Sequence, residues 1–380
     1  MAPRRACAFR RPPFAFLGAA ALLVPRLAPP LVIAGVGRWA IALRAQGSVA
    51  GRGCASLVRN GQLAEPWLPK AELLRRYKGA YTTARTVDGA AAVFELSAHC
   101  QRLHDTATAI LQQELASADA PGASASQALT FLEAAGPDGL RPLVRREIGA
   151  ALKALGRDSC EAEKASRAGQ GKEGAEQEDY QVTMLLTWDS VGSHTPQGRG
   201  FDIFTFVQPL PQVAPLVDVQ ARRAERQNPT IKDVQWVSDR QYLEEIQREA
   251  GVNEVLMFDE DGKITEGLQT NFFAVAKDGA LLTAPDERVL AGTVRKLVLE
   301  VAERHSLLVR FECPNIHDLA SWESCFICST SRLVRPVQAL AAPELAAERR
   351  FPAEGSTAQR LQALVEEAVR GSSEPLAESA

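Results

Sequence analysis

The order of strand-like and helix-like segments is the feature that most limits the fold of this chain. Short apolar runs typical of strands and longer stretches with helical spacing are mixed, without the regular strand–helix–strand alternation of a parallel sheet. Pro209, Pro211 and Pro215 stand between two strand-like runs, and 380 residues are enough for two domains. We therefore predict an α+β fold with an N-terminal domain over residues 70–210 and a C-terminal domain over residues 211–371.

Local patterns predict the elements of these domains. Strand-like residues 81–86 and 92–96 flank a turn at Asp88–Gly89, which predicts a hairpin. Residues 97–111 follow with apolar side chains at helical spacing. Further helices are predicted at residues 126–135, 141–155, 232–250, 293–305 and 357–370.

The first 60 residues differ in composition from the rest of the chain. They contain nine arginines and no Asp, Glu or Lys, and the apolar run 14–24 has the length of a signal-peptide core. A second apolar stretch, 31–43, also falls short of the roughly 18 uncharged residues that a membrane span needs. We predict that residues 1–60 are a targeting leader, removed or disordered, for a plastid or another organelle. The alternative for this segment is a mispredicted start or a signal anchor, and the alternative location of the protein is the cytoplasm. We expect no stable membrane insertion of the mature protein.

Two further segments are predicted to lie outside the packed domains. Residues 157–179 are charged, contain glycine and lack apolar periodicity, which is typical of a flexible surface insertion. The polar residues 372–380 are predicted to form a disordered tail. The net charge of −3 gives no reason to expect nucleic acid as a partner.

The cysteines give no indication of a metal site or a disulfide framework. Cys325 and Cys328 have the spacing of a metal-binding pair, but they stand alone in a strand-like run. Residues three apart in a strand point to opposite faces, so we predict no metal ligands here.

Five segments carry the residues that could perform chemistry. Lys232 lies in Thr230–Trp236, and Glu266 follows it by 34 residues in Ile264–Phe273. Taken singly, the lysine is consistent with a solvated helix start and the glutamate with a turn. The other three segments are Gly79–Leu103, Leu290–Arg295 and Phe326–Val337.

In this order and spacing, the five segments resemble the class IV (fold type IV) pyridoxal phosphate enzymes. That family includes branched-chain aminotransferases, D-amino acid aminotransferases and aminodeoxychorismate lyases. The resemblance covers roughly residues 75–345 and is nearest to plant proteins described as branched-chain or D-amino acid aminotransferase-like. It implies a two-domain fold with pyridoxal 5'-phosphate in the cleft between the domains, and a homodimer.

The resemblance also implies roles for individual residues. Lys232 would hold the cofactor as a Schiff base and move protons, and Glu266 would keep the pyridine nitrogen protonated. Arg102, in a segment similar to the family's His-x-x-Arg-Leu, would bind the phosphate. The remaining cofactor-binding residues implied are Leu290, Thr293, Val294 and Thr330. The candidate substrate residues are Tyr81, Arg85, Ser331 and Arg332.

These roles predict an aminotransferase that passes an amino group between an amino acid and a 2-oxo acid, with branched-chain and D-amino acids as the candidate substrates. Three features leave alternatives open. Val237 stands where branched-chain aminotransferases carry tyrosine, and Arg332 replaces a small residue. Residues 81–85 and 96–99 are similar to aminodeoxychorismate lyases. A lyase of the same family, or a catalytically inactive cofactor-binding homologue, are therefore the alternatives.

Overall fold

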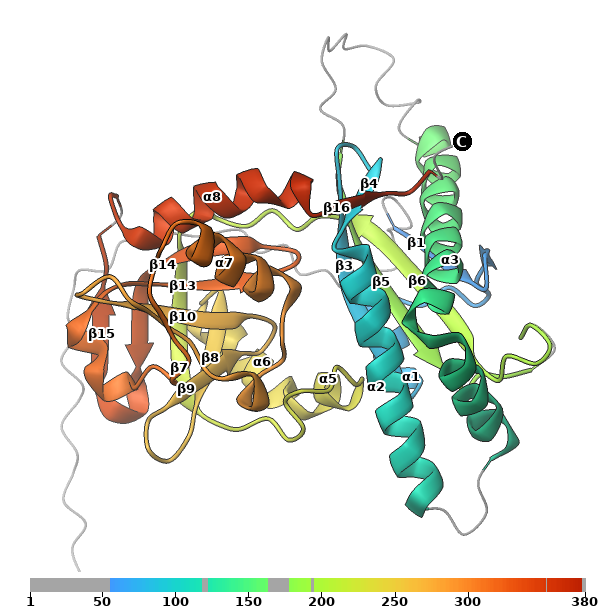
Figure 1. Cartoon of the computed structure of the whole chain (residues 1–380), viewed down its shortest axis with the longest axis horizontal. Helices are drawn as coiled ribbons and strands as arrows, with labels where there is room; N and C mark the ends of the chain where they lie inside the picture. The colour runs from blue at the N-terminus through green and yellow to red at the C-terminus, as the bar shows by residue number, and fades with distance from the viewer. Residues whose placement is uncertain (1–54, 118–121, 163–177, 193–194, 353, 378–380) are drawn as a thin grey trace, which may run out of the picture. The chain divides into compact units, whose positions relative to one another are not determined.

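The computed structural model describes residues 55–117, 122–162, 178–192, 195–352 and 354–377 (Figure 1). These residues form two sheets, and each sheet has its own helices. The predicted leader lies outside the described residues up to position 54, and so do residues 163–177 of the predicted insertion. No helix in the described ranges is both long and apolar enough to cross a membrane.

The first sheet has seven strands, and every neighbouring pair is antiparallel. In spatial order they are β16 (Ser373–Pro375), β4 (Ala92–Phe94), β3 (Ala80–Val87), β5 (Tyr180–Thr187), β6 (Asp202–Pro209), β1 (Ser56–Arg59) and β2 (Gln62–Leu63). The predicted hairpin at Asp88–Gly89 is β3 and β4.

Two long helices supply the core of this sheet. Helices α2 (Leu96–Ser117) and α3 (Ala123–Ala162) bury apolar side chains against β3, β5 and β6. The helices predicted at 126–135 and 141–155 both lie within α3, and Gly136 separates them with non-helical backbone angles (φ 60°). Glycine can adopt this conformation without a side-chain penalty, so it can serve as the break between the two parts.

The second sheet has nine strands and closes on itself. Eight follow the order β12 (Val309–Arg310), β11 (Leu281–Leu282), β10 (Asn271–Ala276), β13 (Trp322–Ser329), β14 (Leu333–Ala342), β7 (Val217–Arg223), β8 (Glu254–Phe258) and β9 (Ile264–Gly267). The ninth, β15 (Ala347–Arg350), pairs with β14. Because β9 pairs with both β8 and β10, six of these strands form a closed circle around an apolar core.

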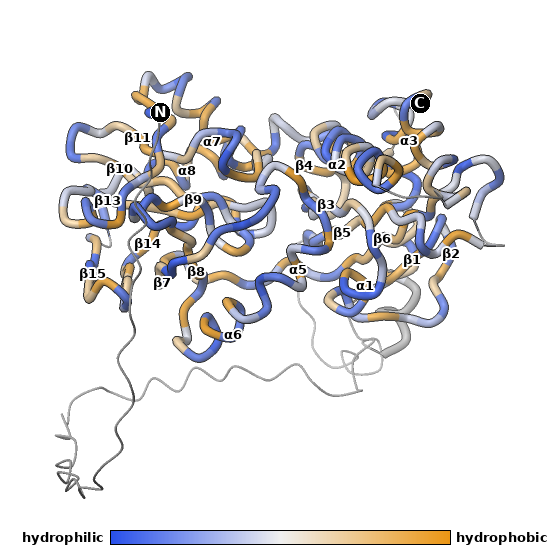
Figure 2. Tube along the Cα trace, turned by 90° about the horizontal axis from the view of Figure 1, so that it is seen from below, coloured by the Kyte–Doolittle hydropathy of each residue, from blue (hydrophilic) through white to orange (hydrophobic). Residues whose placement is uncertain are grey.

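Four helices accompany the second sheet: α5 (Gln235–Asp239), α6 (Gln241–Ala250), α7 (Thr293–Arg304) and α8 (Thr357–Gly371). Hydrophilic and hydrophobic positions alternate along α6 in Figure 2, and Leu243 is its buried residue. Helices α7 and α8 share an apolar cluster with β10 and β13, which contains Cys328 but not Cys325. The two sulfurs therefore belong to opposite faces of β13, as the sequence predicted.

The ordered fold extends further at both ends than the sequence predicted. Strand β1 lies inside the stretch expected to be a leader, and Leu57 and Val58 are buried in it. Strand β16 lies inside the expected tail 372–380, and its Ser373 is paired with Phe94. Both are short strands whose order comes from pairing with segments distant in sequence, β6 for β1 and β4 for β16.

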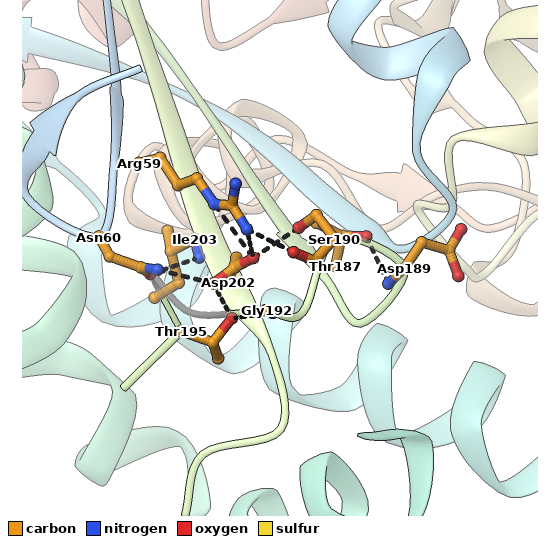
Figure 3. A network of polar contacts seen from close by, with 9 residues as sticks. All are labelled: Arg59, Asn60, Thr187, Asp189, Ser190, Gly192, Thr195, Asp202 and Ile203. Carbon is orange, nitrogen blue, oxygen red and sulfur yellow. Dashed lines mark hydrogen bonds and ion pairs between the residues drawn. The ribbon is translucent and has the colours of Figure 1, made fainter. Parts of the chain in front are cut away.

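A polar network fixes the connection between β1 and the loop that precedes β6 (Figure 3). The fully buried Asp202 carboxylate accepts hydrogen bonds from Arg59, Asn60, Ser190 and Thr195, at distances from 2.5 to 3.1 Å. A buried carboxylate is tolerated because charged and polar donors surround it. This network is a structural feature, since none of its residues lines the cavity described next.

Candidate active site

A cavity of about 110 Å³ brings together residues from both sheets. From the first sheet come side chains of β3 and β5, and from helix α2 comes Arg102. The second sheet contributes β9, the start of β10, the start of α7 and the turn between β13 and β14. Nine of the eleven site residues predicted from sequence line the cavity. Seven of these nine are Tyr81, Arg102, Lys232, Glu266, Leu290, Thr293 and Val294.

The other two of the nine, Thr330 and Ser331, lie in the turn after β13. The remaining two predicted residues, Arg85 and Arg332, do not line the cavity.

Lys232 occupies the loop between β7 and α5. Its carbonyl accepts a hydrogen bond from the Tyr81 backbone N–H at 3.1 Å, which ties this loop to β3. Its Nζ atom lies 4.9 Å from the centroid of the Tyr81 ring. Burial lowers the pKa of the Lys232 amine well below its usual value, and the nearby cations Arg102, Arg226 and Arg240 lower it further. A neutral amine is the form that attacks an aldehyde, so the surroundings favour a nucleophile.

Glu266 lies in β9 and is only 4% exposed. Its Oε2 atom accepts the Leu290 backbone N–H at 3.2 Å, and its Oε1 atom is 3.3 Å from Nη1 of Arg226. Burial raises the pKa of the Glu266 carboxyl, although Arg226, the Leu290 N–H and Lys232 all act in the opposite direction. The carboxylate is thus held in place and lies close to Lys232.

The start of helix α7 has the properties of an anion site. Gly292 is its N-cap residue, and no side chain caps the first backbone N–H groups. A side chain at Gly292 would collide with Asn271 Oδ1, so this close approach favours glycine. The hydroxyls of Thr293 and Thr330 are 2.9 Å apart beside these groups.

Arg102 supplies a fixed cation at the same place. Its Nη2 atom donates to the Ala291 carbonyl at 2.5 Å, one residue before the helix cap. Burial lowers the pKa of Arg102 to about 10, and the positive charge of Arg226 contributes. Free N–H groups, two hydroxyls and a guanidinium together match the needs of a phosphate.

Arg85 and Arg332, two of the predicted substrate residues, contact other charged groups of the protein. Arg332 donates to Glu254 Oε2 and to the Asn253 carbonyl, both at 3.2 Å, because the fully buried Glu254 carboxylate requires a cation. Arg85 lies on the same face of β3 as Tyr81 and Thr83, but two residues further along the strand than Thr83. There its guanidinium interacts with the charges of Asp179, Arg335 and Glu366, and it does not line the cavity. Neither guanidinium points into the cavity.

Sequence reasoning missed several polar residues that line the cavity. The charged ones are Lys70, Arg226 and Arg240, and the uncharged ones include Thr83, Gln181 and Asn271. Lys70 is 162 positions before Lys232, in a helix outside the matching motifs. Arg226 stands six residues before Lys232, and this short separation in sequence was the one indication that Arg226 could belong to the site.

Comparison with known proteins now gives the family. The model of the amino-transferase class IV family matches residues 79–340, more than half of the chain. The chain belongs to the class IV aminotransferases. A protein of Methanocaldococcus jannaschii, named as a branched-chain-amino-acid aminotransferase, is 31% identical over 144 residues. That match covers 36% of this chain and about half, 49%, of the relative.

Solved class IV aminotransferase structures share the fold. The branched-chain aminotransferase of Thermoproteus uzoniensis with norvaline has a TM-score of 0.58 at 17% identity, covering 86% of this chain and 100% of that one. A hypothetical aminotransferase of Mycobacterium tuberculosis in its PLP-bound form has a TM-score of 0.57 at 17% identity, with 83% and 99% covered. The fold type IV architecture predicted from sequence is confirmed. The likeness to plant proteins, the homodimer and the destination of the leader stay predictions.

Proposed function

We propose that this chain is an aminotransferase that passes an amino group between an amino acid and a 2-oxo acid, with pyridoxal phosphate held on Lys232. The observation that carries the proposal is the arrangement of one cavity. It contains a buried lysine of lowered pKa, a buried glutamate and a helix start suited to phosphate. Membership of the class IV family supports it.

The residues of the cavity fit this cofactor. Its phosphate needs backbone donors and a fixed cation, which α7, Thr293, Thr330 and Arg102 offer. Its pyridinium N–H needs a buried carboxylate, which Glu266 offers. When bound, pyridoxal phosphate supplies an aldehyde that captures amines and a ring that accepts electrons.

The remaining chemistry belongs to residues of this chain. Lys232, whose pKa is lowered by burial, would bind the aldehyde through its amine. Once the substrate's amino group has displaced it, the freed amine would carry a proton between the substrate's α-carbon and the cofactor. Tyr81 covers the amine with its ring and excludes water from it. Glu266, held by Leu290 and Arg226, can keep a proton on the ring nitrogen. Ser331 and Thr330 border the space left for the substrate.

An assay with the full chain loaded with pyridoxal phosphate tests the proposal. A panel of amino acids is offered with and without a 2-oxo acid, and both products are quantified. We expect amino transfer that requires the oxo acid, and Lys232→Ala should reduce turnover by at least about 10³-fold.

Lys263→Ala is the matched control, because Lys263 is exposed in the β8–β9 turn and does not line the cavity. Unchanged turnover in Lys232→Ala contradicts the proposal. Product formed without any oxo acid would indicate a lyase instead, and a loaded protein that turns over no member of the panel would indicate an inactive homologue.

A further inference from the structure

The turn between β13 and β14 borders the cavity and lies beyond the ladder that joins the two strands. The ladder ends with the pair Ser329 and Leu333, and the Arg332 backbone N–H donates to the Ser329 carbonyl at 3.2 Å. Thr330 and Ser331, the two central residues of this turn, both line the cavity. The contacts that hold the turn therefore decide where these two residues lie in the cavity wall.

The backbone of this turn needs support from its surroundings. Leu333, which follows Arg332, has φ 54°, in the left-handed region that residues other than glycine rarely adopt. Such a conformation persists only where neighbouring contacts maintain it. On one side of the turn, the hydroxyl of Thr330 lies 2.9 Å from that of Thr293 at the start of α7. On the other side, the contacts come from the side chain of Arg332.

Arg332 joins the turn to strand β8. Its Nη1 atom donates to Glu254 Oε2 and to the Asn253 carbonyl, both at 3.2 Å. The side chain of Glu254 is 1% exposed and that of Arg332 is 16% exposed, so water has little access to the ion pair. Breaking a pair of this kind costs far more than breaking a surface pair, so it can fix the geometry of the segments that it joins.

Glu254 lies directly behind the cavity wall that carries Glu266. It begins β8, which pairs with β9, and in β9 Glu266 precedes Gly267. A side chain at Gly267 would collide with the side chain of Glu254, so the two residues are in close contact. Gly267 itself lines the cavity. Arg332 thus connects the turn at residues 330–331 to the wall that contains Glu266.

We propose that Arg332 is a positioning residue, which through Glu254 holds Thr330 beside Thr293 so that both hydroxyls bind one phosphate. The inference rests on the proposed function, because the phosphate is that of the cofactor. Arg332 does not line the cavity, so it acts through the turn. An ion pair that only stabilised the fold would affect all ligands of the cavity equally, whereas a positioning residue affects the phosphate contacts selectively.

Two aldehydes that differ by the phosphate test this role. The full chain without cofactor is titrated with pyridoxal phosphate and with pyridoxal, and each Kd is measured by absorption. Both compounds carry the same aldehyde, so the ratio of their Kd values reports the phosphate contacts. We expect Arg332→Met to weaken binding of pyridoxal phosphate by about tenfold and to leave the Kd of pyridoxal within about threefold, since a hydrogen bond to a charged group is worth about tenfold.

Three further variants separate positioning from stability. Arg332→Lys keeps a cation for Glu254, so it should retain most of the preference for pyridoxal phosphate. Arg332→Met combined with Glu254→Gln removes both charges, which should restore the free energy of unfolding but not the preference, and it serves if Arg332→Met does not fold. Arg335→Met is the matched control and should leave the preference unchanged. Arg335 also pairs with a glutamate, at 3.1 Å, and its side chain is 17% exposed, but its partner Glu366 belongs to α8.

An unchanged ratio of the two Kd values in Arg332→Met would overturn the positioning role while leaving the proposed function intact. A ratio that recovers together with stability in the double variant would overturn it as well. An unmodified protein that binds neither aldehyde contradicts the proposed function and the inference with it.

Discussion

At the scale of single residues, burial prepares the two central groups of the site. The same loss of water lowers the pKa of Lys232 and raises that of Glu266. Arg226, 5% exposed at its side chain, then depends on Glu266 for its counter-charge.

Removing the Glu266 carboxylate should therefore destabilise the protein, because Arg226 loses its counter-charge. We expect Glu266→Leu to lower the free energy of unfolding of the cofactor-free protein by about 3–5 kcal/mol, because it leaves a buried guanidinium unpaired. Adding Arg226→Met should recover part of that loss. Urea unfolding of the single and double variants gives the coupling energy. A double variant less stable than Glu266→Leu would contradict the dependence.

The residues of the site were predictable from sequence to different degrees. Lys232, Glu266 and Arg102 lie in segments whose local pattern is specific as a set. Lys70 and Arg240 were not predictable, because only the tertiary fold brings helix α1 (Lys70–Arg76) and the α5–α6 junction to the cavity. The pairing of Arg332 with Glu254 was not predictable, because the sequence does not show that Glu254 is buried.

At the scale of elements, one histidine connects α2 to β3. His99 is fully buried, its Nδ1 lies 2.7 Å from Thr82 Oγ1, and its Nε2 has no hydrogen-bond partner among the described residues. Burial lowers the pKa of His99 well below its usual value of about 6.5, and Arg102 and Lys232 add to the effect. The histidine is thus neutral when folded.

Acid should lower the free energy of unfolding through His99. Below about pH 6.5 the unfolded chain binds a proton at His99 and the folded chain does not, so stability is present above that pH and is lost as the pH falls. The contribution reaches at most about 1.4 kcal/mol per pH unit. We expect the double variant His99→Leu, Thr82→Val to lack this part of the pH dependence. Urea unfolding at pH 7.5, 6.5 and 5.5 checks it, and parallel pH profiles of the two proteins would contradict it.

Element prediction succeeded where the signal was local and failed where it was not. The β3–β4 hairpin and helices α7 and α8 follow from a turn pair and from helical spacing. Strands β1 and β16 are short, and their order depends on pairing with β6 and β4, which are far away in sequence. The sequence predicted two helices within α3, and the non-helical Gly136 does separate α3 into two parts.

At the scale of the whole molecule, the candidate site depends on both sheets. Tyr81 and Gln181 come from the first, and Glu266 and the start of α7 belong with the second. The mixture of strands and helices without regular alternation predicted two α+β domains, and the fold comparisons confirm that architecture. The residues of the cavity could not be deduced from that order of elements alone, because a fold does not determine its site.

The most direct test of this assignment is the absorption spectrum of the full-length protein with pyridoxal phosphate, before and after borohydride, beside Lys232→Ala. We predict a yellow band that borohydride removes, with the fixed cofactor located on Lys232 by peptide mass spectrometry, and neither effect in the variant. A colourless protein that pyridoxal phosphate cannot reconstitute, or a cofactor fixed on another lysine, would contradict the assignment of Lys232.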